Sequence, residues 1–213
     1  TETNEYEVLI MLNFGVIAPL LISFVISAAA GPKIIGILRR LKAGQTVRDD
    51  GPQTHLKKNG TPTMGGIIFL LGVVVTCLFY VKDYPKIIPV LFMTVGFGIV
   101  GFLDDYIKVV LKRSEGLTPG QKMAGQLVVT AVFAYYMVKY SEAGLTMLVP
   151  FCQGLTIDLG WLSIPLLFFV VIGTVNGTNF TDGLDGLASS VTVIVAVFFS
   201  VVALGTGTGI APV

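Results

Sequence analysis

The sequence is poor in charged residues. Only 13% of its 213 residues are Asp, Glu, Lys or Arg, whereas 54% are hydrophobic, and the mean hydropathy is +0.83. Soluble domains contain about 25% charged residues, so this composition excludes an ordinary soluble domain. It predicts an all-α helical bundle that crosses a membrane several times, because helices satisfy their own backbone hydrogen bonds in lipid.

Histidine and cysteine are also scarce. His55 is the single histidine, which excludes a metal site built from several histidines. Cys77 and Cys152 lie far apart, in or beside apolar stretches. We interpret them as small buried hydrophobic residues rather than as a disulfide framework or a metal site. The net charge of +1 says little about partners, and we expect no nucleic acid among them.

Six apolar stretches are long enough, or nearly so, to cross a bilayer as helices. We predict one transmembrane domain over residues 1–213, with spans at residues 9–31, 64–81, 87–103, 121–140, 160–176 and 188–204. Thr118, Pro119 and Gln121 have the spacing of a capping box and predict the start of the fourth helix. The fifth apolar run is short, so its span must borrow preceding residues or place the polar residues that follow it within the membrane level.

Basic residues concentrate in one connection, between Pro32 and Thr63. Seven of the fourteen Lys and Arg residues lie there: Lys33, Arg39, Arg40, Lys42, Arg48, Lys57 and Lys58. By the positive-inside rule this connection faces the cytoplasm, which places the N-terminus outside. Residues 141–160 contain no Lys or Arg, as expected of an external loop.

A polar stretch, Asn176–Leu187, lies between the last two apolar runs. Asn176, Asn179, Asp182 and Asp185 recur at every third position. This spacing lines up one face of a 3₁₀ turn and drifts by about 60° per step in an α-helix, and in either case we expect the four side chains to converge. Carboxylates close to hydrocarbon are unfavourable and usually functional. The alternative is a polar loop in which Asp182 or Asp185 caps the next helix.

Two further polar elements face the same predicted side. Asp104 and Asp105 follow the third span, and adjacent carboxylates repel unless a cation such as Mg²⁺ lies between them and a phosphate. A solvated helix end is the alternative. Lys57 and Lys58 precede a run of Thr and Gly that could bind phosphate. The alternative is a basic loop that orients the protein in the membrane and contacts anionic lipid, without a catalytic role. The residues alone predict an interfacial enzyme that uses Mg²⁺ and a phosphorylated substrate.

Four blocks of the sequence together resemble the phospho-N-acetylmuramoyl-pentapeptide transferases (MraY) of bacterial cell-wall synthesis. The blocks are His55–Gly66, Gly101–Lys108, Pro119–Gln126 and Asn176–Leu187, and they occur in the order typical of that family. The second and fourth blocks resemble the wider superfamily of polyprenyl-phosphate hexose-1-phosphate transferases. The first and third blocks are similar to its muramyl branch.

The resemblance implies an Mg²⁺-dependent enzyme of the bacterial plasma membrane with its active site on the cytoplasmic side. It implies transfer of phospho-MurNAc-pentapeptide from UDP-MurNAc-pentapeptide to undecaprenyl phosphate, which gives lipid I and UMP. Asp104 is implied as the base that activates the lipid phosphate, with Asp105 beside it as the candidate metal ligand. The implied substrate-binding residues are Lys58, Thr63, Asn176, Asn179, Asp182, Gly183 and Asp185. A homodimer is expected from the family alone.

The sequence also departs from that family. Its members have further spans, a further Mg²⁺-binding Asp and a histidine-rich motif in their C-terminal part, so we expect this chain alone to be inactive. One alternative is a sister transferase that moves GlcNAc-1-phosphate to the same lipid. Alternatives from other classes are a transporter or flippase, in which Asp182 and Asp185 bind a coupling ion in a broken helix, and a structural membrane subunit.

Overall fold

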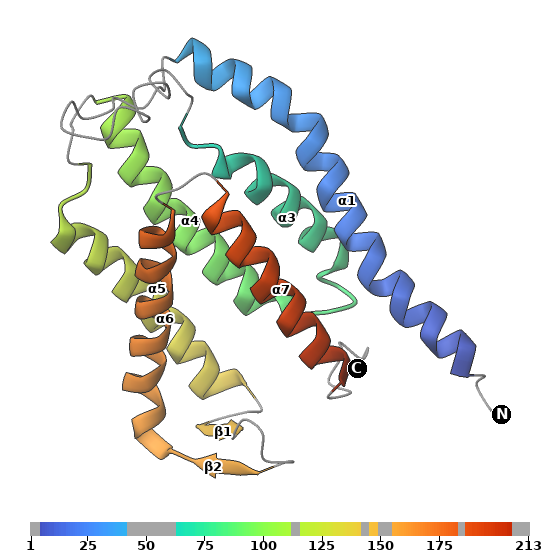
Figure 1. Ribbon diagram of the computed structural model, residues 1–213. Helices are drawn as coiled ribbons and strands as arrows, with labels where there is room; N and C mark the ends of the chain where they lie inside the picture. Colours follow the sequence, from blue (N-terminus) through green and yellow to red (C-terminus); the bar gives the residue numbers. More distant parts are fainter. Residues whose placement is uncertain are drawn as a thin grey trace. The chain divides into compact units, whose positions relative to one another are not determined.

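The computed structural model describes residues 5–41, 63–111, 116–141, 145–148, 155–182 and 186–205, with side chains from position 17 to position 201. Within these ranges the chain is almost entirely helical, which confirms the all-α prediction (Figure 1). The chain divides into two compact units, residues 1–124 and 125–213. Three residues predicted to bind substrate lie outside the described residues: Lys58, Gly183 and Asp185.

Each predicted span contains a helix. The first unit comprises α1 (Glu5–Arg40), α3 (Gly66–Tyr80), α4 (Ile87–Val109) and the start of α5 (Pro119–Tyr140). The second unit comprises the rest of α5, strands β1 (Thr146–Leu148) and β2 (Thr156–Asp158), a 3₁₀ turn η1 (Gly160–Leu162), α6 (Ser163–Thr181) and α7 (Leu187–Gly205).

Three helical segments among the described residues are long and apolar enough to cross a membrane: Ile17–Arg40, Ile87–Val109 and Gly160–Thr181. Helix α3 and residues 187–201 of α7 are shorter apolar helices. The chain is therefore a multi-pass membrane protein, as its composition predicts. The number of spans stays a prediction.

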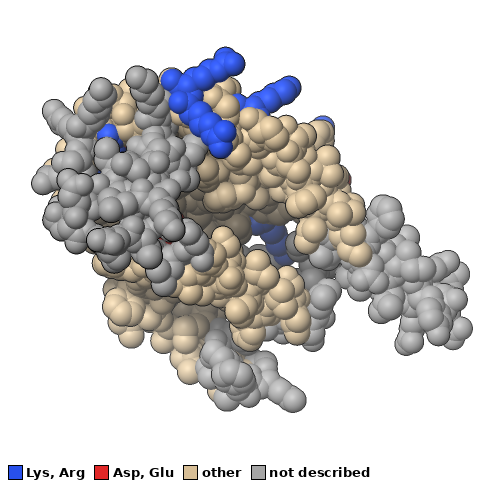
Figure 2. Space-filling model, turned by 45° about the horizontal axis from the view of Figure 1, so that its top comes forward, with Lys and Arg blue, Asp and Glu red and all other residues tan. Residues whose placement is uncertain are grey.

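Several helices continue beyond the apolar stretches that predict them. Helix α1 passes through Pro32 to Arg40, although we predicted a polar loop from Pro32 onward. A proline inside a helix removes one backbone hydrogen bond, and membrane helices tolerate this loss. Arg39 and Arg40 occupy the last turn of α1, where positive charge complements the helix dipole. Both are exposed, and Figure 2 shows Lys and Arg side chains projecting at the top of the view.

The antiparallel ribbon of β1 and β2 was not predicted. Thr146 pairs with Asp158, Met147 with Ile157, and Leu148 with Thr156. Three-residue strands are too short to show an alternating pattern in the sequence. The predicted external loop, residues 141–160, therefore contains ordered β-structure between α5 and α6.

In the first unit, α1 and α3 pack closely through small residues. Gly72 of α3 faces Ser23 and Ser27 of α1: a Cβ at position 72 would overlap the Ser27 hydroxyl and lie 2.7 Å from the Ser23 carbonyl oxygen. The Ser27 hydroxyl in turn donates a hydrogen bond to the Ile68 carbonyl, at 3.3 Å. Small residues at such a crossing let two membrane helices approach closely.

Gly72→Ala is therefore expected to lower stability by about 1–3 kcal/mol, the range for overpacking a close contact. The measurement is the thermal unfolding midpoint of the detergent-solubilised protein. Gly36→Ala on α1 is the matched control, because a Cβ at Gly36 meets nothing within 4 Å and alanine favours the helix. Equal midpoints for the two variants would contradict the close packing of α1 on α3.

Candidate functional site

A buried carboxylate lies near the end of α4. Asp104 is buried, with only 7% of its surface exposed. Its Oδ2 accepts a hydrogen bond from Lys108 Nζ at 2.6 Å, and Lys122 Nζ lies 3.9 Å from the same oxygen. Its Oδ1 accepts the Leu117 backbone N–H at 2.9 Å. Two lysines and one amide thus compensate a charge that would be unfavourable in this position on its own.

Helix α4 extends to Val109, so Asp104 and Asp105 lie inside the helix rather than beyond its end. Lys108 follows Asp104 by one turn, which is the spacing at which side chains on a helix meet. Consecutive residues point about 100° apart on a helix, so Asp104 and Asp105 project in different directions. The repulsion we expected between adjacent carboxylates is therefore reduced, and lysines neutralise Asp104.

Gly116 brings the following segment against Asp104. Its φ is +64°, and a Cβ at this position would lie 2.6 Å from Asp104 Oδ1 and 2.6 Å from Lys108 Cε. A left-handed backbone and the lack of a side chain are both needed here, and glycine supplies both. The close approach allows the next residue, Leu117, to donate its N–H to Asp104.

The predicted capping box at the start of α5 is confirmed. The Thr118 N–H donates to Gln121 Oε1 at 3.1 Å, and the Gln121 N–H donates to Thr118 Oγ1 at 3.3 Å. This reciprocal pair fixes where α5 begins. It thereby directs Lys122, in the first turn and a half of the helix, toward Asp104.

Thr63, a predicted substrate-binding residue, is half-buried just before α3. The next residue, Met64, has a φ of 68°. This is a left-handed backbone conformation that residues other than Gly, Asn and Asp rarely adopt. Local strain of this kind persists where the surrounding structure holds it and often marks a functional segment. This observation agrees with a role for the segment but assigns none to Thr63 itself.

Asn176 and Asn179, the first two of the four polar residues that recur at every third position, are helical because α6 extends to Thr181. Asn176 is half-buried and exchanges two hydrogen bonds with Gln126 of α5, whereas Asn179 and Asp182 are exposed. Asp182 is the C-cap of α6, not an N-cap, and its N–H donates to the Thr178 carbonyl. The three described members of the series, Asn176, Asn179 and Asp182, do not converge, because Asn176 faces α5 whereas Asn179 and Asp182 are exposed.

Sequence reasoning missed Lys108, Lys122 and Gln126 as members of these clusters. A signal existed for Lys108, since an Asp followed four residues later by Lys is a common helical ion pair. Lys122 and Gln126 belong to the block Pro119–Gln126, but nothing local shows which residues they face. Among the described residues, no group of three or more His, Cys, Asp or Glu could hold a metal ion.

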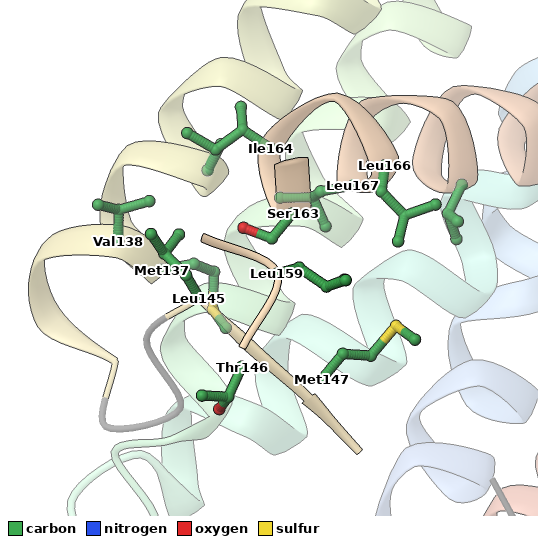
Figure 3. Close-up of a pocket in the computed structure, with 12 residues that line it drawn as sticks. Met137, Val138, Leu145, Thr146, Met147, Leu159, Ser163, Ile164, Leu166 and Leu167 are labelled. Atoms are coloured by element: carbon green, nitrogen blue, oxygen red, sulfur yellow. The ribbon is translucent and has the colours of Figure 1, made fainter. Parts of the chain in front are cut away.

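A separate apolar cavity of about 250 Å³ lies in the second unit (Figure 3). It is lined by Met137 and Val138 of α5, by Leu145 and Met147 next to or on β1, and by residues of α6 that include Ile164. No charged side chain lines it. The cavity is therefore not a site for phosphate chemistry.

Comparison with protein families identifies the chain. Residues 87–211 match the family described as glycosyl transferase family 4. The chain belongs to this family. The matched region contains Asp104, Lys108, Lys122, Gln126 and Asn176. Residues 58–70 match phospho-N-acetylmuramoyl-pentapeptide-transferase signature 1. The resemblance predicted from the four sequence blocks is thus confirmed.

Curated relatives carry the corresponding name. A phospho-N-acetylmuramoyl-pentapeptide-transferase of Acetivibrio thermocellus is 51% identical over 86% of this chain and 56% of its own length. Proteins of the same name from Desulforamulus reducens and Clostridioides difficile are 48% and 49% identical, over 87% and 84% of this chain and 57% and 55% of their own lengths. The chain spans little more than half the length of these relatives.

Proposed function

We propose that this chain acts in the transfer of phospho-MurNAc-pentapeptide from UDP-MurNAc-pentapeptide to undecaprenyl phosphate, which forms lipid I and UMP. The observation that carries the proposal is the buried Asp104 carboxylate between two lysines, inside the region that matches glycosyl transferase family 4. The match to signature 1 and the names of the relatives favour the muramyl donor over other sugars.

In the proposed reaction, an oxygen of the lipid phosphate attacks the β-phosphorus of the donor. A new pyrophosphate bond forms as the bond between that phosphorus and UMP breaks, so one pyrophosphate replaces another and the driving force is small. Catalysis of such a transfer depends mainly on positioning and on neutralising charge. Asp104 accepts the proton of the lipid phosphate, and Lys108 and Lys122, which hold the carboxylate ionised, attract the phosphate to it.

Mg²⁺ belongs to this proposal, with Asp105 as the candidate ligand. The hard oxygens of a carboxylate fit Mg²⁺, which binds proteins through one or two carboxylates and keeps water and substrate phosphates as its other ligands. When bound, the ion would neutralise charge on the phosphates of the donor.

The donor is proposed to contact the polar residues that follow the fifth apolar run and the Thr-rich segment before α3. Asn179 and Asp182 are exposed and available for such contacts. The remaining members of this proposed set are Lys58, Thr63, Gly183 and Asp185. Asn176, which the resemblance also implied, is instead engaged by Gln126 of α5. The site is proposed to face the cytoplasm of a bacterial plasma membrane, with the N-terminus outside and the protein as a homodimer.

The test is release of UMP from UDP-MurNAc-pentapeptide by the gene product in its natural length, reconstituted with undecaprenyl phosphate and Mg²⁺. We expect UMP to appear only when both substrates are present, and lipid I to form in equal amount. UMP release from UDP-GlcNAc instead would assign the sister transferase. Movement of substrate across vesicles without UMP would assign a transporter, and either result would overturn the proposal.

A further inference from the structure

A reciprocal pair of carboxamides joins α5 to α6. Asn176 Nδ2 donates to Gln126 Oε1 at 3.0 Å, and Gln126 Nε2 donates to Asn176 Oδ1 at 3.3 Å. Among the described residues of α5 and α6, these are the only side-chain hydrogen bonds between the two helices. The pair is well protected, since Gln126 is 1% exposed.

Asn176 has little hydrogen-bonding capacity left for a substrate. Its second amide hydrogen goes to the Ile172 carbonyl at 2.9 Å. Both amide hydrogens and one of the two lone pairs of its oxygen are therefore occupied. If Asn176 left the pair to bind a ligand, the buried carboxamide of Gln126 would lose its hydrogen-bond partner, which is unfavourable in free energy. Asn176 is better suited to hold α6 than to contact a ligand.

The pair also sets the rotation of α6 about its own axis. Each residue of an α-helix turns by about 100°, so Asn179 projects about 60° and Asp182 about 120° from the direction of Asn176. Once Asn176 is held against α5, these two side chains must lie away from Gln126. Both are exposed in the structure.

The rest of α6 does little to fix this rotation. No described residue of α6 is buried, and all residues before Asn176 except Ser163 and Thr174 are apolar. Apolar side chains can slide or rotate in lipid without losing a specific partner. The carboxamide pair is the directional contact.

We propose that Gln126 is a positioning residue: its paired hydrogen bonds with Asn176 fix the rotation of α6 and so present Asn179 and Asp182 to the uridine-nucleotide donor. The inference rests on the proposed function for the identity of the donor. Gln126 itself touches no substrate in this arrangement.

The test compares Gln126→Leu with Thr130→Val in the natural-length protein. Leucine has a similar size and removes both hydrogen bonds. Thr130 lies one turn further on α5 and is fully buried, and its hydroxyl donates a hydrogen bond to the Gln126 backbone carbonyl at 2.8 Å. Thr130→Val therefore removes a buried polar group from the same helix and leaves the carboxamide pair intact.

We expect Gln126→Leu to raise KM for the uridine-nucleotide donor by about 10- to 100-fold, the scale of a misplaced binding group, with KM for the lipid phosphate unchanged. Thr130→Val should behave like the unaltered protein. Equal changes in both KM values, or the same loss in both variants, would mean that Gln126 only supports folding.

Hydrogen–deuterium exchange separates this inference from the proposed function. In the Gln126→Leu variant, the backbone amides of residues 178–182, in the last turn of α6, should exchange faster than in the unaltered protein. This result is expected whether or not UMP is released. A double variant with Gln126→Asn and Asn176→Gln keeps two carboxamides and the same total length, and should recover most of the slow exchange. Unchanged exchange in Gln126→Leu would overturn the inference even if the transferase activity is confirmed.

Discussion

Asp104→Asn is expected to lower kcat for UMP release by about 10³-fold, within the range for loss of a general base. Asparagine has the same size and can still accept the Leu117 N–H through its side-chain oxygen. It carries no negative charge, so it can neither take the proton of the lipid phosphate nor balance Lys108 and Lys122. The loss should therefore appear in kcat and not in the amount of folded protein.

The measurement is a steady-state assay of UMP release with saturating donor and lipid phosphate. Asp83→Asn is the matched control, because Asp83 is an exposed residue between α3 and α4. It should retain full activity. If Asp104→Asn kept more than about a tenth of the rate, a value far above that range, Asp104 would not be the base and its role would be to hold the two lysines.

Gly116→Ala should reduce activity about 100-fold and stability by about 1–3 kcal/mol, although the residue contacts no substrate in the proposed mechanism. Alanine is strained at a φ of +64°, and its Cβ would lie 2.6 Å from Asp104 Oδ1. The segment must then move away, and Leu117 loses its hydrogen bond to the carboxylate. The base would change its position and its electrostatic surroundings together.

Gly120→Ala is the control for this variant, since a Cβ at Gly120, in the first turn of α5, meets nothing within 4 Å. It should be neutral or slightly stabilising. The two variants are compared by UMP release and by thermal unfolding in detergent. A Gly116→Ala protein with normal activity would show that the segment before α5 does not shape the site.

The local parts of this protein could be predicted from the sequence because their causes lie within a few residues. Long apolar runs predict where the helices lie, since a membrane helix needs about 20 apolar residues. The capping box at Thr118 and Gln121 involves two residues three positions apart, and it formed as predicted. The ion pair of Asp104 and Lys108, one turn apart on α4, is also of this local kind.

Helix ends and chain pairings were less predictable. Hydropathy falls where a helix leaves the membrane, but the backbone hydrogen bonds continue, and for this reason α1 passes Pro32 and α6 includes Asn176. The ribbon of β1 and β2 depends on pairing between two strands of three residues, which carry no periodic signal of their own.

Composition, apolar runs and motifs are local properties, so they were enough to predict the membrane-spanning all-α class, the positions of the helices and the family. The partners of the polar side chains depend on the packing of the helices. Leu117 and Lys122 reach Asp104 from 13 and 18 positions away, and Gln126 meets Asn176 across 50. Such contacts depend on how helices pack and rotate against one another, and no local pattern in the chain specifies that rotation.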